Sequence, residues 1–164
     1  MKTIKYQILT LSLILFALKI GYTQETVTLT LIVNTSNFNA DNLNASCTFE
    51  AQWSNSGQVI RSNGNLEDFT IEVNVGDIIV WEGISSTSEN DVIDIKRIAQ
   101  ANNTRIFNNE RNDGQMRGNS NKETVVDKVL FNTNGRPDYK YDVFFKINRS
   151  GPTHKIDPKI RVGN

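Results

Sequence analysis

Four stretches of the 164-residue chain alternate apolar and polar residues one by one: 27–33, 47–53, 69–75 and 139–147. Successive side chains of a β-strand point to opposite faces of a sheet, so this period of two predicts strands with one apolar and one mostly polar face. Such strands are typical of an antiparallel sheet that covers a core on one side and meets water on the other. The pattern restricts the fold to one built mainly of sheets.

Shorter runs at 78–81, 92–98 and 124–131 are rich in β-branched residues, which suit a pleated surface. A last strand is expected over 156–162, where Pro158 cannot donate to a ladder and predicts an edge position or a bulge. We find no convincing helix after residue 23. About eight strands at short spacing predict an all-β fold, an antiparallel β-sandwich of the immunoglobulin or cupredoxin-like kind.

Two segments between these strands are expected to be loops. Residues 36–44 join the first two strands, and residues 108–122 hold Met116 as their one apolar side chain. A segment that buries so little apolar surface opens at a low free energy, so we predict that 108–122 is the most mobile internal segment.

The N-terminus has the pattern of a secretory signal peptide. Lys2 and Lys5 precede an apolar run over 8–18, and Lys19 closes that run. A charged start followed by about 7–15 apolar residues is typical of a cleaved signal. The alternative is a membrane anchor, which needs about 20 apolar residues and is therefore disfavoured by the early lysine.

Small residues near the end of this segment predict the cleavage site. Gly21 and Thr23 suit the −3 and −1 positions, so the cut is expected between Thr23 and Gln24. Removal of the signal, residues 1–23, leaves one domain over 24–164, exported to the periplasm or the exterior. Three of the 18 basic residues and none of the 18 acidic ones lie in the signal, so the mature net charge is −3. This charge argues against nucleic acid, and no membrane span is expected in the mature chain.

The residues that usually carry chemistry are scarce. One thiol, Cys47, and one imidazole, His154, are too few for the usual zinc sets or for a blue-copper site. We therefore expect no metal and no other cofactor, and no nucleophile–histidine catalysis. Glu89, Asp91 and Asp94 lie close in sequence and leave open a glycan hydrolase that works with carboxylates alone.

Aromatic residues offer a possible platform for sugars. Trp53, Tyr139 and Tyr141 fall on the apolar faces of their strands, which favours packing in the core. The position of Trp81 is less determined, because Glu82 and a glycine follow it. Trp81 is therefore our candidate for contact with a ligand.

Residues 69–98 and 139–162 carry a family resemblance. A strand, a Val-Gly-Asp turn, an Ile-x-Trp strand, a serine-rich loop and an Asp-Val-x-Ile strand are followed, near the end of the chain, by Asp157-Pro158-Lys-Ile-Arg-Val. This order resembles the bacterial inclusion-body protein (PixA/AidA) family. The resemblance implies a β-sandwich of no known catalytic activity that sometimes self-assembles. Residues 73–81 are also similar to the strand–turn–strand of cupredoxins, without the copper ligands.

From these observations we expect an exported, non-catalytic β-sandwich protein that acts by binding or by self-association. The alternative is a carbohydrate- or surface-binding module, and the third possibility is the carboxylate glycan hydrolase. An exposed, aromatic-lined groove favours binding, and two carboxylates about 5–10 Å apart across a cleft favour hydrolysis. A flat, apolar sandwich face or a long unpaired strand edge favours assembly. The partner itself, a glycan or a second copy, is not determined by the sequence.

Overall fold

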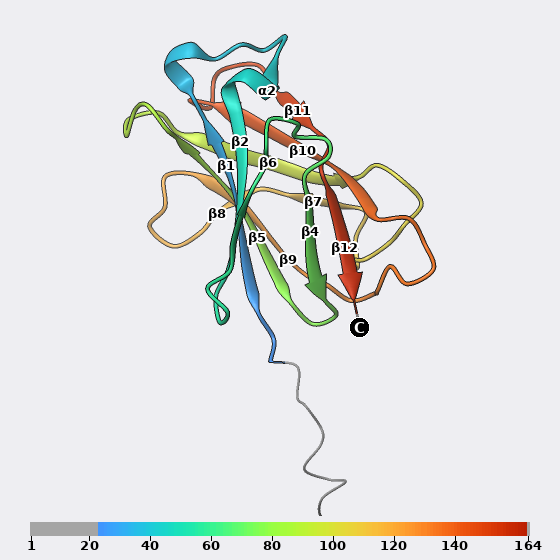
Figure 1. The fold of residues 1–164 in the computed structure, drawn as a ribbon. Helices are drawn as coiled ribbons and strands as arrows, with labels where there is room; N and C mark the ends of the chain where they lie inside the picture. Colours follow the sequence, from blue (N-terminus) through green and yellow to red (C-terminus); the bar gives the residue numbers. More distant parts are fainter. Residues whose placement is uncertain (1–22, 164) are drawn as a thin grey trace, which may run out of the picture.

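Two six-stranded sheets lie face to face in the structure, a computed structural model that describes residues 23–163 (Figure 1). The first sheet has the strand order β3-β2-β1-β5-β9-β8. The second has the order β4-β12-β10-β6-β7, with β11 paired to β10. The prediction of an all-β sandwich is confirmed.

The bounds of the elements follow the chain. The first sheet consists of β1 (Thr26–Val33), β2 (Cys47–Trp53), β3 (Val59–Arg61), β5 (Ile78–Ser85), β8 (Gln115–Met116) and β9 (Glu123–Lys128). The second consists of β4 (Thr70–Asn74), β6 (Ile93–Gln100), β7 (Arg111–Asp113), β10 (Tyr139–Ile147), β11 (His154–Ile156) and β12 (Lys159–Gly163). A 3-10 turn, η1 (Thr35–Asn37), and a one-turn helix, α2 (Leu43–Ser46), lie in the segment expected to be a loop.

The sheets differ from the expected sandwich in two ways. They contain twelve strands rather than about eight, because four short strands have too few residues to show alternation. They are also mixed rather than purely antiparallel, since β1 pairs with β5 and β4 pairs with β12 in parallel. Parallel neighbours need a crossover between them, and here the chain makes it by passing through other strands of the sandwich.

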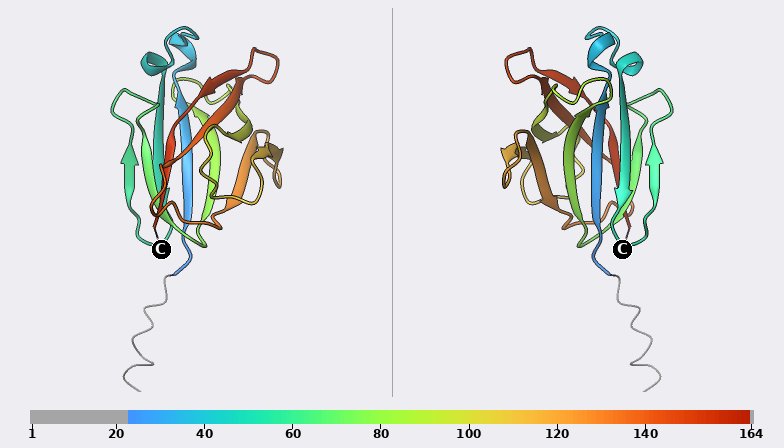
Figure 2. Two further views of the ribbon diagram at one scale, coloured as in Figure 1. Left: turned by 90° about the vertical axis from the view of Figure 1, so that its right-hand side faces the viewer. Right: turned by 90° about the vertical axis from the view of Figure 1, so that its left-hand side faces the viewer.

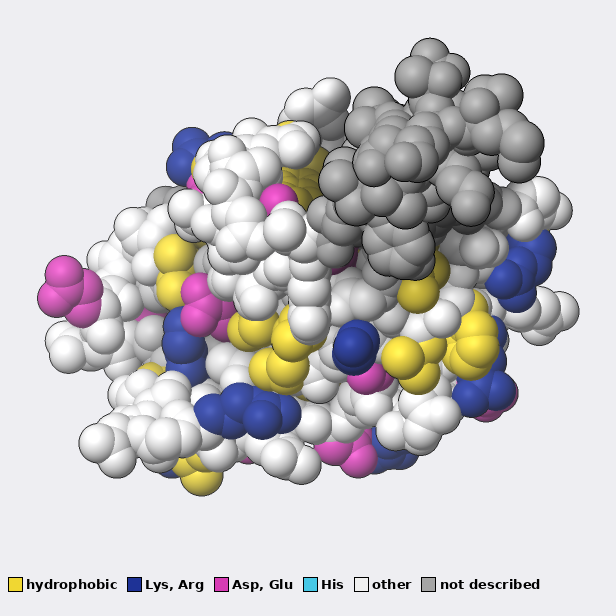
Figure 3. All heavy atoms as spheres, turned by 90° about the horizontal axis from the view of Figure 1, so that it is seen from below, with side chains coloured by type: hydrophobic (Ala, Val, Ile, Leu, Met, Phe, Trp, Pro, Cys, Tyr) yellow, Lys and Arg dark blue, Asp and Glu magenta, His cyan; other side chains and the backbone are white. Residues whose placement is uncertain are grey.

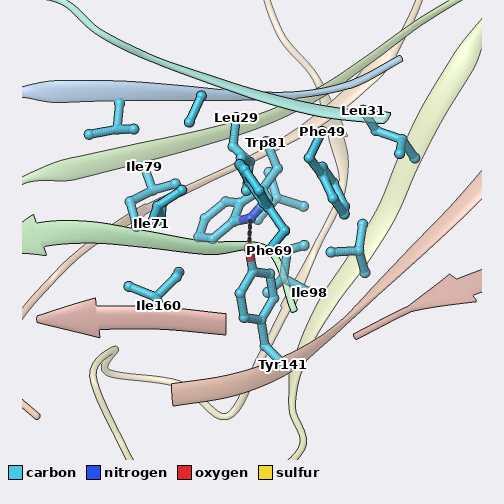
Figure 4. Close-up of a cluster of buried hydrophobic side chains, with 14 of the residues drawn as sticks. Leu29, Leu31, Phe49, Phe69, Ile71, Ile79, Trp81, Ile98, Tyr141 and Ile160 are labelled. Carbon is cyan, nitrogen blue, oxygen red and sulfur yellow. Dashed lines mark hydrogen bonds between the residues drawn. The ribbon is translucent and has the colours of Figure 1, made fainter. Parts of the chain in front are cut away.

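The alternating stretches place their apolar faces between the sheets. In β10 the buried residues Tyr139, Tyr141, Val143 and Phe145 alternate with partly buried ones. Side chains from both sheets meet in one cluster, which Figure 4 shows around Trp81 and Tyr141. Figure 2 shows from the side that β10 crosses the strands of the first sheet obliquely, so the core lies between two twisted layers.

Pro158 divides the last strand into β11 and β12. Its carbonyl accepts a hydrogen bond from the Tyr141 N–H at 3.2 Å, while its own nitrogen has no proton to donate. The expected edge position holds for β11, which pairs with β10 alone, but not for β12, which lies between β4 and β10. The proline is accommodated by the interruption of the strand, with one piece on each part of β10.

The segment 108–122 is more regular than its composition predicts. Residues Arg111–Asp113 pair with β6, and Gln115–Met116 pair with β9. Between them Gly114 donates its N–H to the Lys96 carbonyl at 2.8 Å. Backbone pairing thus holds residues 111–116 against both sheets, although they bury no apolar side chain and Met116 is exposed.

The turn that joins β4 to β5 is built around the buried side chain of Asp77. Its carboxylate accepts the backbone N–H of Asn74 at 2.8 Å and that of Glu25 at 2.9 Å. Gly76 takes a positive φ of 102°, a conformation that favours glycine. The turn therefore fixes the start of β1 against the end of β4.

The surface at the end of the sandwich where β1 begins has no continuous apolar face among the described residues that Figure 3 shows. Figure 3 looks at this end and shows hydrophobic side chains in separate patches, interrupted by charged and polar ones. The exposed large hydrophobic residues of the described chain lie on different strands and loops: Val59, Val75, Ile84, Met116, Leu130 and Phe131. Single exposed apolar residues of this kind are normal on a protein surface.

Candidate ligand-binding groove

Trp81 does not reach the surface. It lies on β5 with 1% of its surface exposed, and its indole N–H donates to the Tyr141 hydroxyl at 3.3 Å. Phe107 and Tyr141 pack edge-on against its ring, and Figure 4 shows the indole inside the core. The expectation that Trp81 contacts a ligand is therefore wrong. The alternation that placed Trp53 and the tyrosines in the core applies to Trp81 as well.

The predicted cleavage site lies at the beginning of the described chain. Thr23 and Gln24 are exposed, and the Gln24 carbonyl accepts a hydrogen bond from the Asn55 side chain at 3.1 Å. The predicted signal peptide, residues 1–23, lies outside the described residues except for Thr23. Strand β1 begins at Thr26, so a cut before Gln24 would leave the whole strand in the mature protein. The cut stays a prediction.

The three candidate carboxylates have different surroundings. Glu89 is exposed. Asp91 accepts hydrogen bonds from the Thr35 hydroxyl at 2.6 Å and from the Asn148 amide at 2.7 Å, and these bonds lower its pKa. Asp94 is fully buried and accepts the Glu123 N–H at 2.8 Å. These contacts join loops and strands to one another, and the hydrolase that works with carboxylates stays a prediction.

The side chains of Cys47 and His154 also pack against other residues of the fold. Cys47 is buried on β2, and burial raises the pKa of its thiol to about 11. His154 packs its ring against Phe38 and Phe145, and burial lowers its pKa. Within residues 23–163, no three His, Cys, Asp or Glu side chains gather closely enough to hold a metal ion.

A groove on the outer face of the second sheet brings together residues that sequence reasoning did not single out. Its volume is about 570 Å³, within the range of small-molecule sites. The lining comes from strands β6, β7, β10 and β11 with the adjoining turns, and from the first residue of β9 in the other sheet. It consists of Lys96, Arg97, Arg111, Asp113, Gly114, Glu123, Phe144, Thr153 and Lys155.

The floor of the groove is a row of residues directly opposite one another on four strands. Arg97 on β6 pairs with Asp113 on β7 and with Phe144 on β10. Phe144 in turn pairs with Lys155 on β11. Residues opposite each other in a sheet point to the same face, and the neighbours of Phe144 along β10 are buried in the core. The row therefore faces outward.

A β-bulge next to this row adds one more cation. Phe144 pairs with Arg97, but Phe145 pairs with Ile95, so Lys96 has no partner in the ladder. A regular strand would send Lys96 and Arg97 to opposite faces, whereas both line the groove here. Bulges commonly redirect side chains in this way next to functional sites.

Most of the charges in the groove are already paired. Lys96 forms an ion pair with Glu123, Arg111 with Asp113 at 2.9 Å, and Lys155 with Asp142 at 3.2 Å. Surface pairs of this kind contribute little to stability, but they neutralise the charges and orient the side chains.

Arg97 is the exception. Its guanidinium carbon lies 3.8 Å from the centre of the Phe144 ring, a cation–π contact. Its side chain makes no hydrogen bond or ion pair with any residue between 23 and 163, and its Nε atom is buried without a partner. Buried polar atoms nearly always have a partner, so this one needs an explanation.

A second hollow, of about 670 Å³, lies at the seam between β4 and the β2–β3 side of the first sheet. Its arginine, Arg161, donates to Asp138 at 2.9 and 3.0 Å and to Glu72 at 2.9 Å. These carboxylates raise the pKa of Arg161 and already occupy its donors. The smaller groove around Arg97 is therefore the better candidate site.

Comparison of the sequence with protein-family models gives no match, and comparison with curated proteins gives none either. The resemblance to the inclusion-body protein family therefore stays a prediction. No helix within residues 23–163 is long and apolar enough to cross a membrane.

Proposed function

We propose that this chain is an exported, non-catalytic glycan-binding protein, and that the groove on the outer face of its second sheet holds the ligand. The observation that carries the proposal is the Arg97 guanidinium, stacked on Phe144 with its hydrogen-bond donors unused. An aromatic ring with a few polar groups around a concave surface is the usual composition of a small-ligand site. In the free protein these donors, of which Nε is buried, form no hydrogen bond that would stabilise the fold.

The short strand edges argue for binding rather than self-association. The strands that pair on one side only are β3, β8, β4, β7 and β11, and they have three, two, five, three and three residues. Ion pairs flank the longest of them, β4, where Arg161 bonds Glu72 and Lys159 bonds Asp68. Short edges with charged side chains are a common protection against edge-to-edge pairing.

An array of neutral and acidic oligosaccharides tests this proposal. We expect the purified protein to retain at least one of them without releasing cleaved sugar. A Thr153→Trp variant fills the groove from its exposed rim and should lose that binding, while Ser56→Trp, which fills the second hollow, should keep it. Oligosaccharide binding that persists in Thr153→Trp would show that the groove is not the binding site. Release of shorter sugars would show that the protein is catalytic.

A further inference from the structure

We infer that the groove selects an acidic sugar, a uronate whose carboxylate binds Arg97. This inference rests on the proposed function and adds the chemical class of the ligand. Arg97 supplies the charge, because it is the one cation of the groove lining whose side chain has no carboxylate partner among residues 23–163. A carboxylate is the group that matches the planar donor fork of a guanidinium.

The stacking of Arg97 on Phe144 prepares this interaction. The guanidinium carbon lies 3.8 Å from the ring centre, and the N–H groups of a planar guanidinium point outward in its own plane. The β-bulge and the opposed pairing with Phe144 hold the side chain in position before a ligand arrives. A preorganised arginine loses less side-chain entropy when a ligand binds. The lower entropy cost raises the affinity for a small anion that makes only a few contacts.

The other charges of the groove favour one carboxylate among hydroxyl groups. Asp113 and Glu123 lie beside the cations and act as acceptors for hydroxyl donors. Lys155 and Thr153 on the opposite side can donate to hydroxyl oxygens. A uronate offers both kinds of partner, whereas a chain of several acidic groups would meet repulsion from the two carboxylates.

The direct test compares sugars whose carboxyl group is either charged or esterified. D-galacturonate and D-glucuronate are titrated into the purified protein beside their neutral methyl esters, and backbone amide shifts are followed by NMR. We expect the uronates to shift the amides of Gly114 and Phe144 and to bind at least about tenfold more tightly than the esters, since a hydrogen bond to a charged group is worth that factor or more.

Variants connect the selectivity to Arg97. Arg97→Gln should weaken uronate binding at least about tenfold and leave ester binding unchanged, and Arg97→Lys should recover only part of the loss. Arg61→Gln removes an exposed arginine on β3 and serves as the matched control, with no expected change. If Arg97→Gln fails to fold, Thr153→Trp replaces it, and it should abolish the shifts that the uronates cause.

The outcomes separate this inference from the proposed function. Esters that bind as tightly as uronates would overturn the inference and leave a glycan-binding groove. Acetate or a hexaglutamate peptide that binds as tightly as a uronate would overturn the sugar class. If neither uronates nor the esters shift the groove amides at millimolar concentration, the inference fails, and a blank oligosaccharide array would overturn the proposed function as well.

Discussion

The two faces of the second sheet differ in whether their polar side-chain atoms have hydrogen-bond partners. On the inner face the Tyr141 hydroxyl lies deep in the core and accepts the indole N–H of Trp81. On the outer face the Arg97 side chain lies on Phe144 and has no hydrogen-bond partner among the described residues. An unpaired buried donor costs free energy, so the inner face is arranged for stability and the outer one is not. The difference indicates which face is available for a function.

The same contrast exists between the two hollows of the molecule. Arg161 at the seam is held by Glu72 and Asp138, which makes it a link between β12, β4 and the loop before β10. Arg97 in the groove contacts the ring of Phe144 on β10 and forms no hydrogen bond or ion pair with the described residues. The first arginine has a structural use, and the second is free to bind a ligand.

The largest effect is expected in the core. Trp81→Ala should lower the free energy of unfolding by about 3–5 kcal/mol, because it removes a buried indole and leaves the Tyr141 hydroxyl without its donor. Phe144→Ala on the outer face should cost less than about 2 kcal/mol, since that ring is already partly exposed. Urea denaturation measures both. Equal losses would remove the distinction between the two faces.

A smaller loss is expected where the β7–β8 connection passes over β6. A Cβ atom on Gly114 would lie 1.9 Å from the Ile95 carbonyl oxygen, so Gly114→Ala must displace backbone and should cost about 1–3 kcal/mol. The neighbouring exposed residue gives the control, since Gln115→Ala should change stability by less than about 0.5 kcal/mol. Thermal unfolding of the two variants checks this, and an unchanged melting temperature for Gly114→Ala would show that the connection is loosely held.

The two arginines should differ in their effect on stability. Arg161→Gln is expected to lower the melting temperature, because it leaves Glu72 and Asp138 without their partner. Arg97→Gln should change the melting temperature less, since the loss of the cation–π contact with Phe144 is offset by removal of a charged donor that has no partner. Differential scanning calorimetry at low salt measures both changes. A larger loss for Arg97→Gln would mean that this arginine stabilises the fold.

The smallest effect concerns pH. Burial lowers the pKa of His154, so the unfolded chain takes up a proton more readily than the folded one. Stability should therefore be complete above the unfolded value of about 6.5 and decrease as the pH falls below it. His154→Phe, between Phe38 and Phe145, should remove this decrease. The lowered pKa of Asp91 affects stability at a more acidic pH, because protonation of its carboxylate lowers the free energy of unfolding only below about pH 4. The test measures the urea midpoint of the unmodified protein and of His154→Phe from pH 7.5 to 5. If both midpoints fall equally with pH, a group other than His154 causes the decrease.

Particular residues show how far sequence reasoning reaches. The alternation in 139–147 placed Tyr139 and Tyr141 in the core, and the structure confirms both. Trp81 follows the same alternation in β5, but Glu82 and Gly83 obscured the pattern. Arg97 could not be identified, because an arginine beside a lysine in an ordinary strand looks like any solvated pair. Its unusual position depends on a bulge that is defined only against β10.

The class of fold, and the face on which most side chains lie, follow from the amino-acid sequence alone. Alternation is a property of one strand, because the pleat sends neighbouring side chains to opposite sides whatever the strand pairs with. Three arrangements are visible only in the folded chain: β1 lies parallel to β5, β12 is not an edge, and four side chains form one row, Arg97, Asp113, Phe144 and Lys155. These arrangements depend on pairing between distant segments, which is set by the packing of the whole chain and leaves no periodic signal in any one segment.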